Sequence, residues 1–254
     1  MWSGTAGNIM FLNRYIIRFM LYLGRTNQIL CIKNISIETL GNMESYLLSD
    51  GFEVKEIFAD TKTIKSQDLT DYDAVFILGG PMSVNDHVGY LLEEKKLIQS
   101  TFNLEIPVFG ICLGSQLIAS SCGGKVYQAP KKEIGWGQVR ITSRGQSSIF
   151  NKIPGNKIQV FHWHGDTFTL PSDAEILSES DLYIQAFKFQ NALGIQFHLE
   201  VTKDMIQNWI RKYQKELKTE KISEASIFND IDKRVSELKK ISKIVYENFK
   251  VMIE

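Results

Sequence analysis

Cysteine is scarce in this sequence, which has only three such residues in 254: Cys31, Cys112 and Cys122. Their odd number and wide spacing exclude a disulfide framework and favour a reducing compartment. No two of them have the spacing of a metal-binding pair, so a structural zinc site is not expected. We therefore expect a cytoplasmic protein.

Charge of one sign is not in excess either, because 29 basic residues balance 29 acidic ones. A chain without net charge lacks the electrostatic signature of a general nucleic-acid-binding protein, so we expect no nucleic-acid partner. Hydrophobic residues make up 44% of the chain and charged residues 23%, as is ordinary for globular proteins. The length fits one domain, or one domain with a small appendage.

Long hydrophobic runs are also missing. The most apolar stretch, residues 9–23, is interrupted by Asn13, Arg14 and Arg18. It is shorter than a transmembrane helix and lacks the unbroken core of a signal peptide. Three interpretations stay open: a non-native upstream start, an amphipathic helix packed on the domain, or a helix on a membrane surface. We expect no membrane partner, and we treat residues 1–26 as an N-terminal extension.

From Gln28 onward, short apolar segments alternate with helical patterns. This alternation predicts an α/β fold with a mostly parallel, open sheet that has helices on both faces. Such sheets bind ligands beyond the carboxyl ends of their strands. The expected strands are 28–33, 52–58, 74–78, 107–110, 136–141, 158–163, 183–189 and 192–198. The expected helices are 38–50, 89–101, 115–121, 202–217 and 230–251.

The C-terminal helix carries apolar residues at helical spacing. They are Ile231, Val235, Leu238, Ile241, Val245, Phe249 and Met252. This face either packs on its own domain or forms a homo-oligomer or partner interface, and the pattern allows both. We divide the chain into the extension, a main domain at residues 27–218 and a helical C-terminal tail at residues 219–254.

A nucleophile motif lies in the segment from Pro107 to Gln116. A buried strand runs into Gly-Ile-Cys-Leu-Gly, centred on Cys112, and a short helix follows. This is the Gly-x-nucleophile-x-Gly elbow in its required strand–turn–helix context. The unpaired N–H groups of the helix N-terminus are expected to lower the pKa of the thiol. Cys31 and Cys122 instead read as structural cysteines.

A candidate base follows on the last predicted strand, which runs through His198 to Glu200. Residues two apart in an extended chain point to the same side, so these two side chains are expected to share a face while Leu199 turns inward. A carboxylate beside an imidazole fixes its tautomer and supports its cation. His198 can then take a thiol proton and deliver it to a leaving amine.

These motifs together resemble class I glutamine amidotransferases. The resemblance rests on the elbow, on Gly-Gly-Pro-Met-Ser at residues 79–83 and on Phe-His-Leu-Glu at residues 197–200. It runs from about Gln28 to Trp209. It is strongest to the branch resembling the glutaminase domain of GMP synthase, and within it to stand-alone proteins with Glu-Ile-Gly-Trp (133–136) and His-Trp-His-Gly-Asp-Thr-Phe (162–168).

The resemblance implies a role for each matching residue. Cys112 would be the nucleophile, His198 the base and Glu200 the acid that orients it. Gly80 and Leu113 would donate backbone N–H groups to an oxyanion. The family's substrate contacts would fall on five residues: Met82, Gln116, His164, Gly165 and Asp166. Residues 27–218 would form the amidotransferase-like domain, with no cofactor and no metal.

Weaker motifs have simpler explanations. His162 and His164 could be metal ligands, but no third ligand is apparent, and Trp163 between them suggests a packed strand end. Glu133, taken without the resemblance, reads equally well as a solvated surface charge.

Three functions remain open at this point. The first is a glutaminase whose ammonia passes to a separate ATP-using synthetase, since Gly-rich nucleotide-binding loops are absent from the sequence. The second is a self-sufficient γ-glutamyl peptidase or hydrolase, and the third is a non-enzymatic binding protein on the same fold. The related intracellular-protease branch usually has histidine directly after the nucleophile, where this chain has Leu113.

Overall fold

The computed structural model describes residues 26–254, so the interpretations of residues 9–23 lie outside the described residues. The strands are β1 (Gln28–Lys33), β2 (Glu53–Phe58), β3 (Ala74–Ile77), β4 (Val108–Ile111), β5 (Val126–Ile141), β6 (Lys157–Phe168), β7 (Glu175–Glu179), β8 (Ile184–Phe189) and β9 (Ala192–Ile195). The helices are α2 (Asn42–Ser49), α3 (Thr61–Lys65), α4 (Gly89–Leu104), α5 (Leu113–Ser121), α6 (Ser143–Gln146), α7 (Lys203–Lys212), α8 (Gln214–Thr219), α9 (Glu224–Phe228) and α10 (Ile231–Ile253), with a 3₁₀ turn at Leu69–Asp71.

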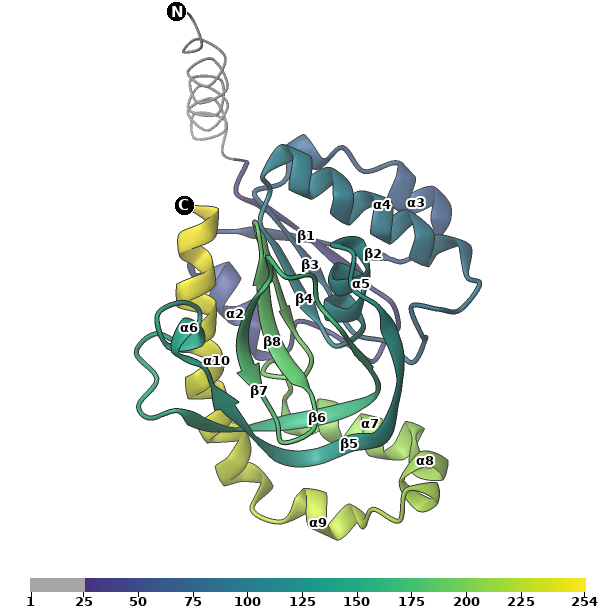
Figure 1. The fold of residues 1–254 in the computed structure, drawn as a ribbon, viewed down its shortest axis with the longest axis vertical. Helices are drawn as coiled ribbons and strands as arrows, with labels where there is room; N and C mark the ends of the chain where they lie inside the picture. Colours follow the sequence, from purple (N-terminus) through teal and green to yellow (C-terminus); the bar gives the residue numbers. More distant parts are fainter. Residues whose placement is uncertain (1–25) are drawn as a thin grey trace, which may run out of the picture.

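The strands form one mixed sheet in the order β2-β1-β3-β4-β9-β8-β7-β5-β6 (Figure 1). The core strands β2, β1, β3, β4 and β9 are parallel, and the remaining pairs are antiparallel. The predicted α/β class with mostly parallel core strands is therefore confirmed. The carboxyl ends of β3, β4 and β9 meet at one edge, and the site lies there.

Successive side chains of the core strands belong in turn to two hydrophobic clusters. On β1, Ile29 and Cys31 belong to one cluster, while Leu30 and Ile32 belong to the other. The first cluster also contains buried residues of α2, α7 and α10, and the second contains those of α3, α4 and α5. Because a strand presents successive side chains to opposite faces, this division shows that helices cover both faces of the sheet (Figure 1).

The helix expected at residues 38–50 begins later than its apolar pattern suggested. Gly41 stands before α2 with a φ of 53°, and a Cβ on it would lie 2.0 Å from the carbonyl oxygen of Glu200. The Asn42 N–H donates to that same oxygen at 2.9 Å. Close contact with the Glu200 segment thus breaks the helix, and it leaves Glu38 in a loop.

Two other predictions needed correction. The helix expected at residues 202–217 is divided at Tyr213 into α7 and α8. The last strand, expected to reach His198, ends at Ile195, although His198 makes an isolated bridge with Phe161 of β6. Strand β7 and the short helices α3, α6 and α9 have no counterpart among the predicted elements.

Helix α10 packs on its own domain. Phe249 contacts the rings of Phe76 and Phe109 edge-on, at centroid distances of 5.5 and 5.0 Å. Ser242 Oγ donates to Asn42 Oδ1 at 2.6 Å, and Asn42 Nδ2 donates to the Leu199 carbonyl at 2.9 Å. This helix therefore covers one face of the sheet and is connected by hydrogen bonds to the segment before Glu200. Within residues 26–254, no helix combines the length and apolar character that crossing a bilayer requires.

Candidate active site

The predicted elbow is present between β4 and α5. Cys112 separates the two elements with φ 52° and ψ −106°, a conformation that is strained for a residue with a side chain. Its N–H donates to the Ile195 carbonyl at 2.9 Å, and its own carbonyl accepts from the Gln116 N–H at 3.1 Å. The backbone therefore holds the thiol at the carboxyl edge of the sheet, as the motif predicts.

The flanking glycines permit the sharpness of this turn. A Cβ on Gly110 would lie 2.6 Å from the carbonyl of Gly114, and a Cβ on Gly114 would lie 2.0 Å from the carbonyl oxygen of Ile77. No side chain fits at such distances. Helix α5 can therefore approach β3 and β4 closely enough for its first turn to begin at Leu113.

The candidate base and its orienting acid are in contact. His198 Nδ1 lies 2.6 Å from Glu200 Oε1, and both side chains are almost fully buried. The backbone N–H of His198 donates to the Phe161 carbonyl at 2.8 Å. The imidazole ring packs edge-on against Trp209, with a centroid distance of 4.7 Å. Leu199, which lies between them in the sequence, turns into the hydrophobic core, as predicted. The alternation thus continues through this segment although the strand has ended.

The protonation of the pair follows from burial and from the neighbouring charges. Burial alone would lower the pKa of His198, but the Glu200 carboxylate and the hydrogen bond with Cys112 raise that pKa well above its usual range. Burial raises the pKa of the Cys112 thiol, and the interaction with His198 opposes this rise. The expected lowering by the helix N-terminus is therefore outweighed, because the thiol is only 6% exposed. The positive charge that favours a thiolate comes from His198.

Cys112 and His198 open onto a pocket of about 320 Å³. The predicted residues that line it are Gly80, Met82, Cys112, Gln116, His164, Gly165, Asp166 and His198. Two predicted residues do not line it: Leu113, which starts α5, and Glu200, which contacts His198. Gly80 nevertheless lies beside Leu113, since a Cβ on Gly80 would be 3.1 Å from Leu113 Cδ2.

Hydrogen bonds connect the pocket wall to the thiol. Gln116 Nε2 donates to the Asp166 carbonyl and to Gln196 Oε1, both at 3.2 Å. Gln196 Nε2 in turn lies 3.8 Å from Cys112 Sγ. The Asp166 carboxylate accepts from Ser83 Oγ at 2.6 Å, so the loop after β3 and the end of β6 are joined across the pocket.

Sequence reasoning missed Glu38, whose carboxyl faces the pocket. Its Oε2 has no hydrogen-bond partner among the described residues and lies 2.0 Å from where a Cβ on Gly79 would stand. Burial raises the pKa of Glu38 to about 7; the His198 charge opposes that rise and the Glu200 charge adds to it. The residue was assigned to a helix in the sequence, and no local signal marks it as part of a site.

A second group of missed residues comes from the C-terminal helices: Trp209, Tyr213 and Glu216 also line the pocket. Glu216 accepts hydrogen bonds from Lys132 Nζ and from Trp163 Nε1, the latter at 3.0 Å. In the single helix expected at residues 202–217, their spacing of four and three residues would place them on one face, and this is the signal that could have found them.

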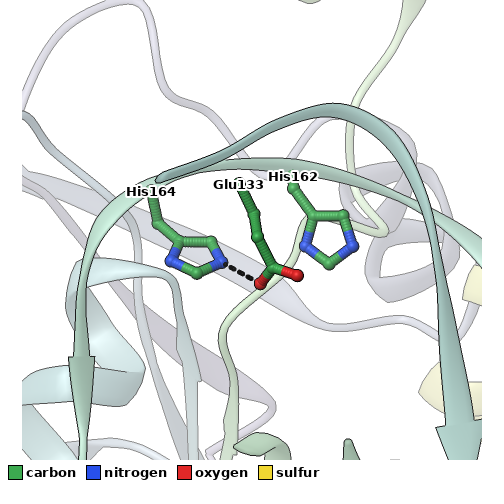
Figure 2. A group of neighbouring side chains, drawn as sticks. All are labelled: Glu133, His162 and His164. Carbon is green, nitrogen blue, oxygen red and sulfur yellow. Dashed lines mark hydrogen bonds and ion pairs between the residues drawn. The ribbon is translucent and has the colours of Figure 1, made fainter. Parts of the chain in front are cut away.

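A cluster of potential metal ligands includes His164 of the pocket wall and two residues behind it. The ligand atoms of Glu133, His162 and His164 all lie within 4.8 Å of one another (Figure 2). Glu133 is therefore a candidate for the third ligand that the sequence did not reveal, and it is neither isolated nor fully solvated. Burial lowers the pKa of His162 to about 4, so this ring is neutral at neutral pH.

Comparisons with known proteins agree with this geometry. Residues 34–212 match the model of the family "Glutamine amidotransferase class-I". The crystal structure of a glutamine amidotransferase from Thermotoga maritima superposes with a TM-score of 0.79 at 33% identity, covering 89% of this chain and 98% of that chain. A glutamine amidotransferase from Methylobacillus flagellatus, 24% identical over 90% of this chain and 96% of that chain, shares the fold with a TM-score of 0.82.

Curated relatives match over part of their own length. The glutamine amidotransferase-like protein YfeJ of Salmonella typhimurium is 33% identical over 58% of this chain and 64% of its own. GMP synthase of Borrelia garinii is 31% identical over 78% of this chain, which corresponds to 37% of that enzyme. The chain thus spans less than two thirds of the length of these curated relatives. Because the family model covers most of the chain and the elbow, pocket and fold agree with it, the chain belongs to the class I glutamine amidotransferase family.

Proposed function

We propose that this protein hydrolyses the γ-amide of glutamine to glutamate and ammonia through Cys112, His198 and Glu200. One observation carries the proposal: a strained elbow presents Cys112 to a pocket also lined by His198, whose Nδ1 lies 2.6 Å from Glu200. A nucleophile, a base and an orienting acid in this order are what acyl transfer from an amide requires.

The first half of the reaction forms a thioester. Sγ of Cys112 attacks the γ-carbonyl carbon as a thiolate, while the proton is held by His198 as an imidazolium that Glu200 stabilises. The backbone N–H groups of Gly80 and Leu113 donate hydrogen bonds that stabilise the negative charge developing on the carbonyl oxygen. His198 then donates its proton to the leaving nitrogen, the C–N bond breaks and ammonia departs.

The second half regenerates the thiol. His198, now neutral, takes a proton from a water molecule, and the resulting hydroxide attacks the thioester carbon. The C–S bond breaks, glutamate leaves and the proton returns to the Cys112–His198 pair. Glu200 holds the ring in one orientation through both steps, since its oxygen stays on Nδ1.

Substrate contacts are proposed for the pocket wall around the thiol. Met82, Gln116, His164, Gly165 and Asp166 line the space that the glutamyl part of the substrate would occupy. Gln116 projects from the first turn of α5 toward the Asp166 carbonyl, at 3.2 Å. This hydrogen bond supports a role for Gln116 in setting the width of the pocket and in meeting the glutamine backbone.

The ammonia is proposed to pass to a separate ATP-using synthetase. Support comes from the glutamine-hydrolyzing GMP synthase of Borrelia garinii, of whose length only 37% is matched by this chain. A self-sufficient γ-glutamyl peptidase would use the same residues and chemistry. The two functions differ in what leaves the thioester: ammonia in the first, and the amine of a peptide in the second.

The test measures glutamate and ammonia release by the purified chain from glutamine and from a γ-glutamyl peptide, each with and without candidate synthetases and ATP. Release from glutamine that a synthetase stimulates supports the ammonia donor. Release from the peptide with glutamine a poor substrate favours the peptidase. No release under any condition, with Cys112 shown to be reduced, would contradict both and favour a binding protein.

A further inference from the structure

Three side chains that can bind a metal share one face of the β5–β6 ribbon. Glu133 of β5 pairs directly with His164 of β6, and His162 lies two residues before His164. Residues two apart on a strand point to the same side, and directly paired residues face each other across the ribbon. The strand register therefore brings the carboxylate and both rings together, and Figure 2 shows the carboxylate between the two rings.

The ring of His164 is oriented as metal-binding imidazoles usually are. Its Nδ1 lies 3.1 Å from the Asp166 carbonyl oxygen, and its Nε2 lies 3.0 Å from Glu133 Oε2. A backbone carbonyl that accepts the proton of one ring nitrogen leaves the other nitrogen as a lone-pair donor. Glu133 is held in turn by Gln185, whose Nε2 donates to Oε2 at 2.6 Å.

His162 supplies an independent observation. It is 3% exposed, and its Nδ1 is buried with no hydrogen-bond partner among the described residues. Its Nε2 lies 2.7 Å from where a Cβ on Gly137 would stand, so the backbone of β5 fixes the ring from that side. A buried polar ring nitrogen without a partner is costly, and coordination of a cation by this nitrogen would remove that cost.

We propose that Glu133, His162 and His164 bind one divalent transition metal ion of the zinc type. Two imidazoles and one carboxylate suit zinc, at distances of about 2.0–2.2 Å from metal to nitrogen or oxygen. Ligand atoms within 4.8 Å of one another can reach those distances by small rotations of the side chains. Imidazole nitrogens disfavour magnesium and calcium, which prefer oxygen ligands.

The metal would stabilise the wall of the pocket without taking part in hydrolysis. His164 lines the pocket, and the Asp166 carbonyl beside its ring also accepts from Gln116. Binding would hold the end of β6 against β5 and fix this carbonyl. The site uses none of the residues assigned to glutamine hydrolysis as nucleophile, base or orienting acid, so it can be tested in a protein without turnover.

The experiment uses full-length Cys112→Ala protein, because Cys112, His198 and Glu200 could themselves bind zinc. After treatment with a chelator, the protein is titrated with Co²⁺ and with Zn²⁺. We expect one equivalent of metal per chain, a visible Co²⁺ spectrum without sulfur-to-metal charge transfer, and a melting temperature raised by roughly 5–10 °C at 100 times the dissociation constant. No binding of either ion would overturn the proposal, whatever the variants do.

Variants then locate the site. His162→Gln and Glu133→Gln, each in the Cys112→Ala background, should lose at least about tenfold in zinc affinity, as removal of a ligand requires. His87→Ala is the matched control, because His87 is exposed and outside the cluster, and it should bind like the parent. Circular dichroism identifies a variant that fails to fold. Binding that persists undiminished in both folded ligand variants would overturn the assignment to these residues.

Discussion

His198 Nδ1 and Glu200 Oε1 lie 2.6 Å apart although the strand that leads to them has ended at Ile195. The contact is maintained because elements other than β9 fix the main chain at His198 and at Glu200. The backbone N–H of His198 donates to the Phe161 carbonyl of β6, and the Glu200 carbonyl accepts from the N–H of Asn42, the first residue of α2. Two elements distant in sequence thus set the geometry of this pair.

The first prediction separates the base from its orienting acid. His198→Ala should lower kcat by about 10²–10⁴-fold, the usual contribution of a general acid–base residue. Glu200→Gln should lower kcat by a smaller factor, because an amide can still orient the His198 ring. Since the carboxylate raises the pKa of His198, its removal should lower that pKa and move the corresponding limb of the pH–rate profile to lower pH.

The measurement is a pH–rate profile of glutaminase activity for the wild type and both variants. Glu224→Gln, an exposed change on α9, is the control and should reproduce the wild-type profile. A Glu200→Gln protein with an unchanged rate and profile would reduce the triad to a Cys–His dyad.

The second prediction concerns selective modification of the thiols. A glutamine-like electrophile should label Cys112 alone, and glutamine should protect it. Cys31 is fully buried in β1 and burial raises the pKa of its thiol, so it should stay unmodified. Cys122→Ala, a change outside the pocket, should label like the wild type. Peptide mapping that found the label on Cys31 or Cys122 would contradict the assignment of the nucleophile.

The sequence predicted the parallel core because β3 and β4 are apolar throughout and short strand-like segments alternate with helical patterns. β1 agrees with its predicted range at both ends, and β3 differs by one residue. β7 and the first half of β5 were missed because their polar side chains break the apolar pattern. Glu133 lies in that missed half of β5, so its position beside His162 and His164 could not be inferred.

The three residues of the proposed triad could be singled out in the sequence because each carries a local signal. Cys112 is flanked by two glycines, and His198 and Glu200 alternate in an extended segment. Glu38 carries no such signal, since its approach to the pocket depends on the break at Gly41 and on contact with Gly79. Trp209 reaches the pocket only through the packing of α7 on the sheet.

The third prediction concerns Glu38 and the pH dependence of stability. Its pKa is raised by burial to about 7, against 4.5 as its ordinary value. The folded protein therefore holds this proton more tightly than the unfolded chain, so the stability it contributes at low pH is lost as pH rises to about 7. Relative to wild type, Glu38→Gln should gain roughly 2–3 kcal/mol in free energy of unfolding between pH 5 and pH 8.

Urea denaturation of both proteins at the two pH values measures this difference. Glu224→Gln serves again as the exposed control, and its stability relative to wild type should not change with pH. A Glu38→Gln protein whose relative stability is the same at pH 5 and pH 8 would show that the Glu38 carboxyl titrates normally.

The fourth prediction tests the close approach of α5 to the sheet. Gly114→Ala should lower the free energy of unfolding by about 3 kcal/mol or more, because its Cβ would lie 2.0 Å from the Ile77 carbonyl oxygen. Gly89→Ala is the matched control in the first turn of α4, where the nearest atom is Thr61 Oγ1 at 3.4 Å. It should be neutral or slightly stabilising. Equal melting temperatures for the two variants would contradict the packing described for the elbow.

Helix α10 lies outside the segment that matches the family, but it packs against the core of the same domain. The segment that matches the family ends at residue 212, before this helix begins. Yet α10 covers Phe76 and Phe109 through Phe249, and its Ser242 holds Asn42, which bonds to Leu199 just ahead of Glu200. A chain cut at the family boundary would expose the aromatic centre of the sheet and release one support of the segment that carries His198 and Glu200.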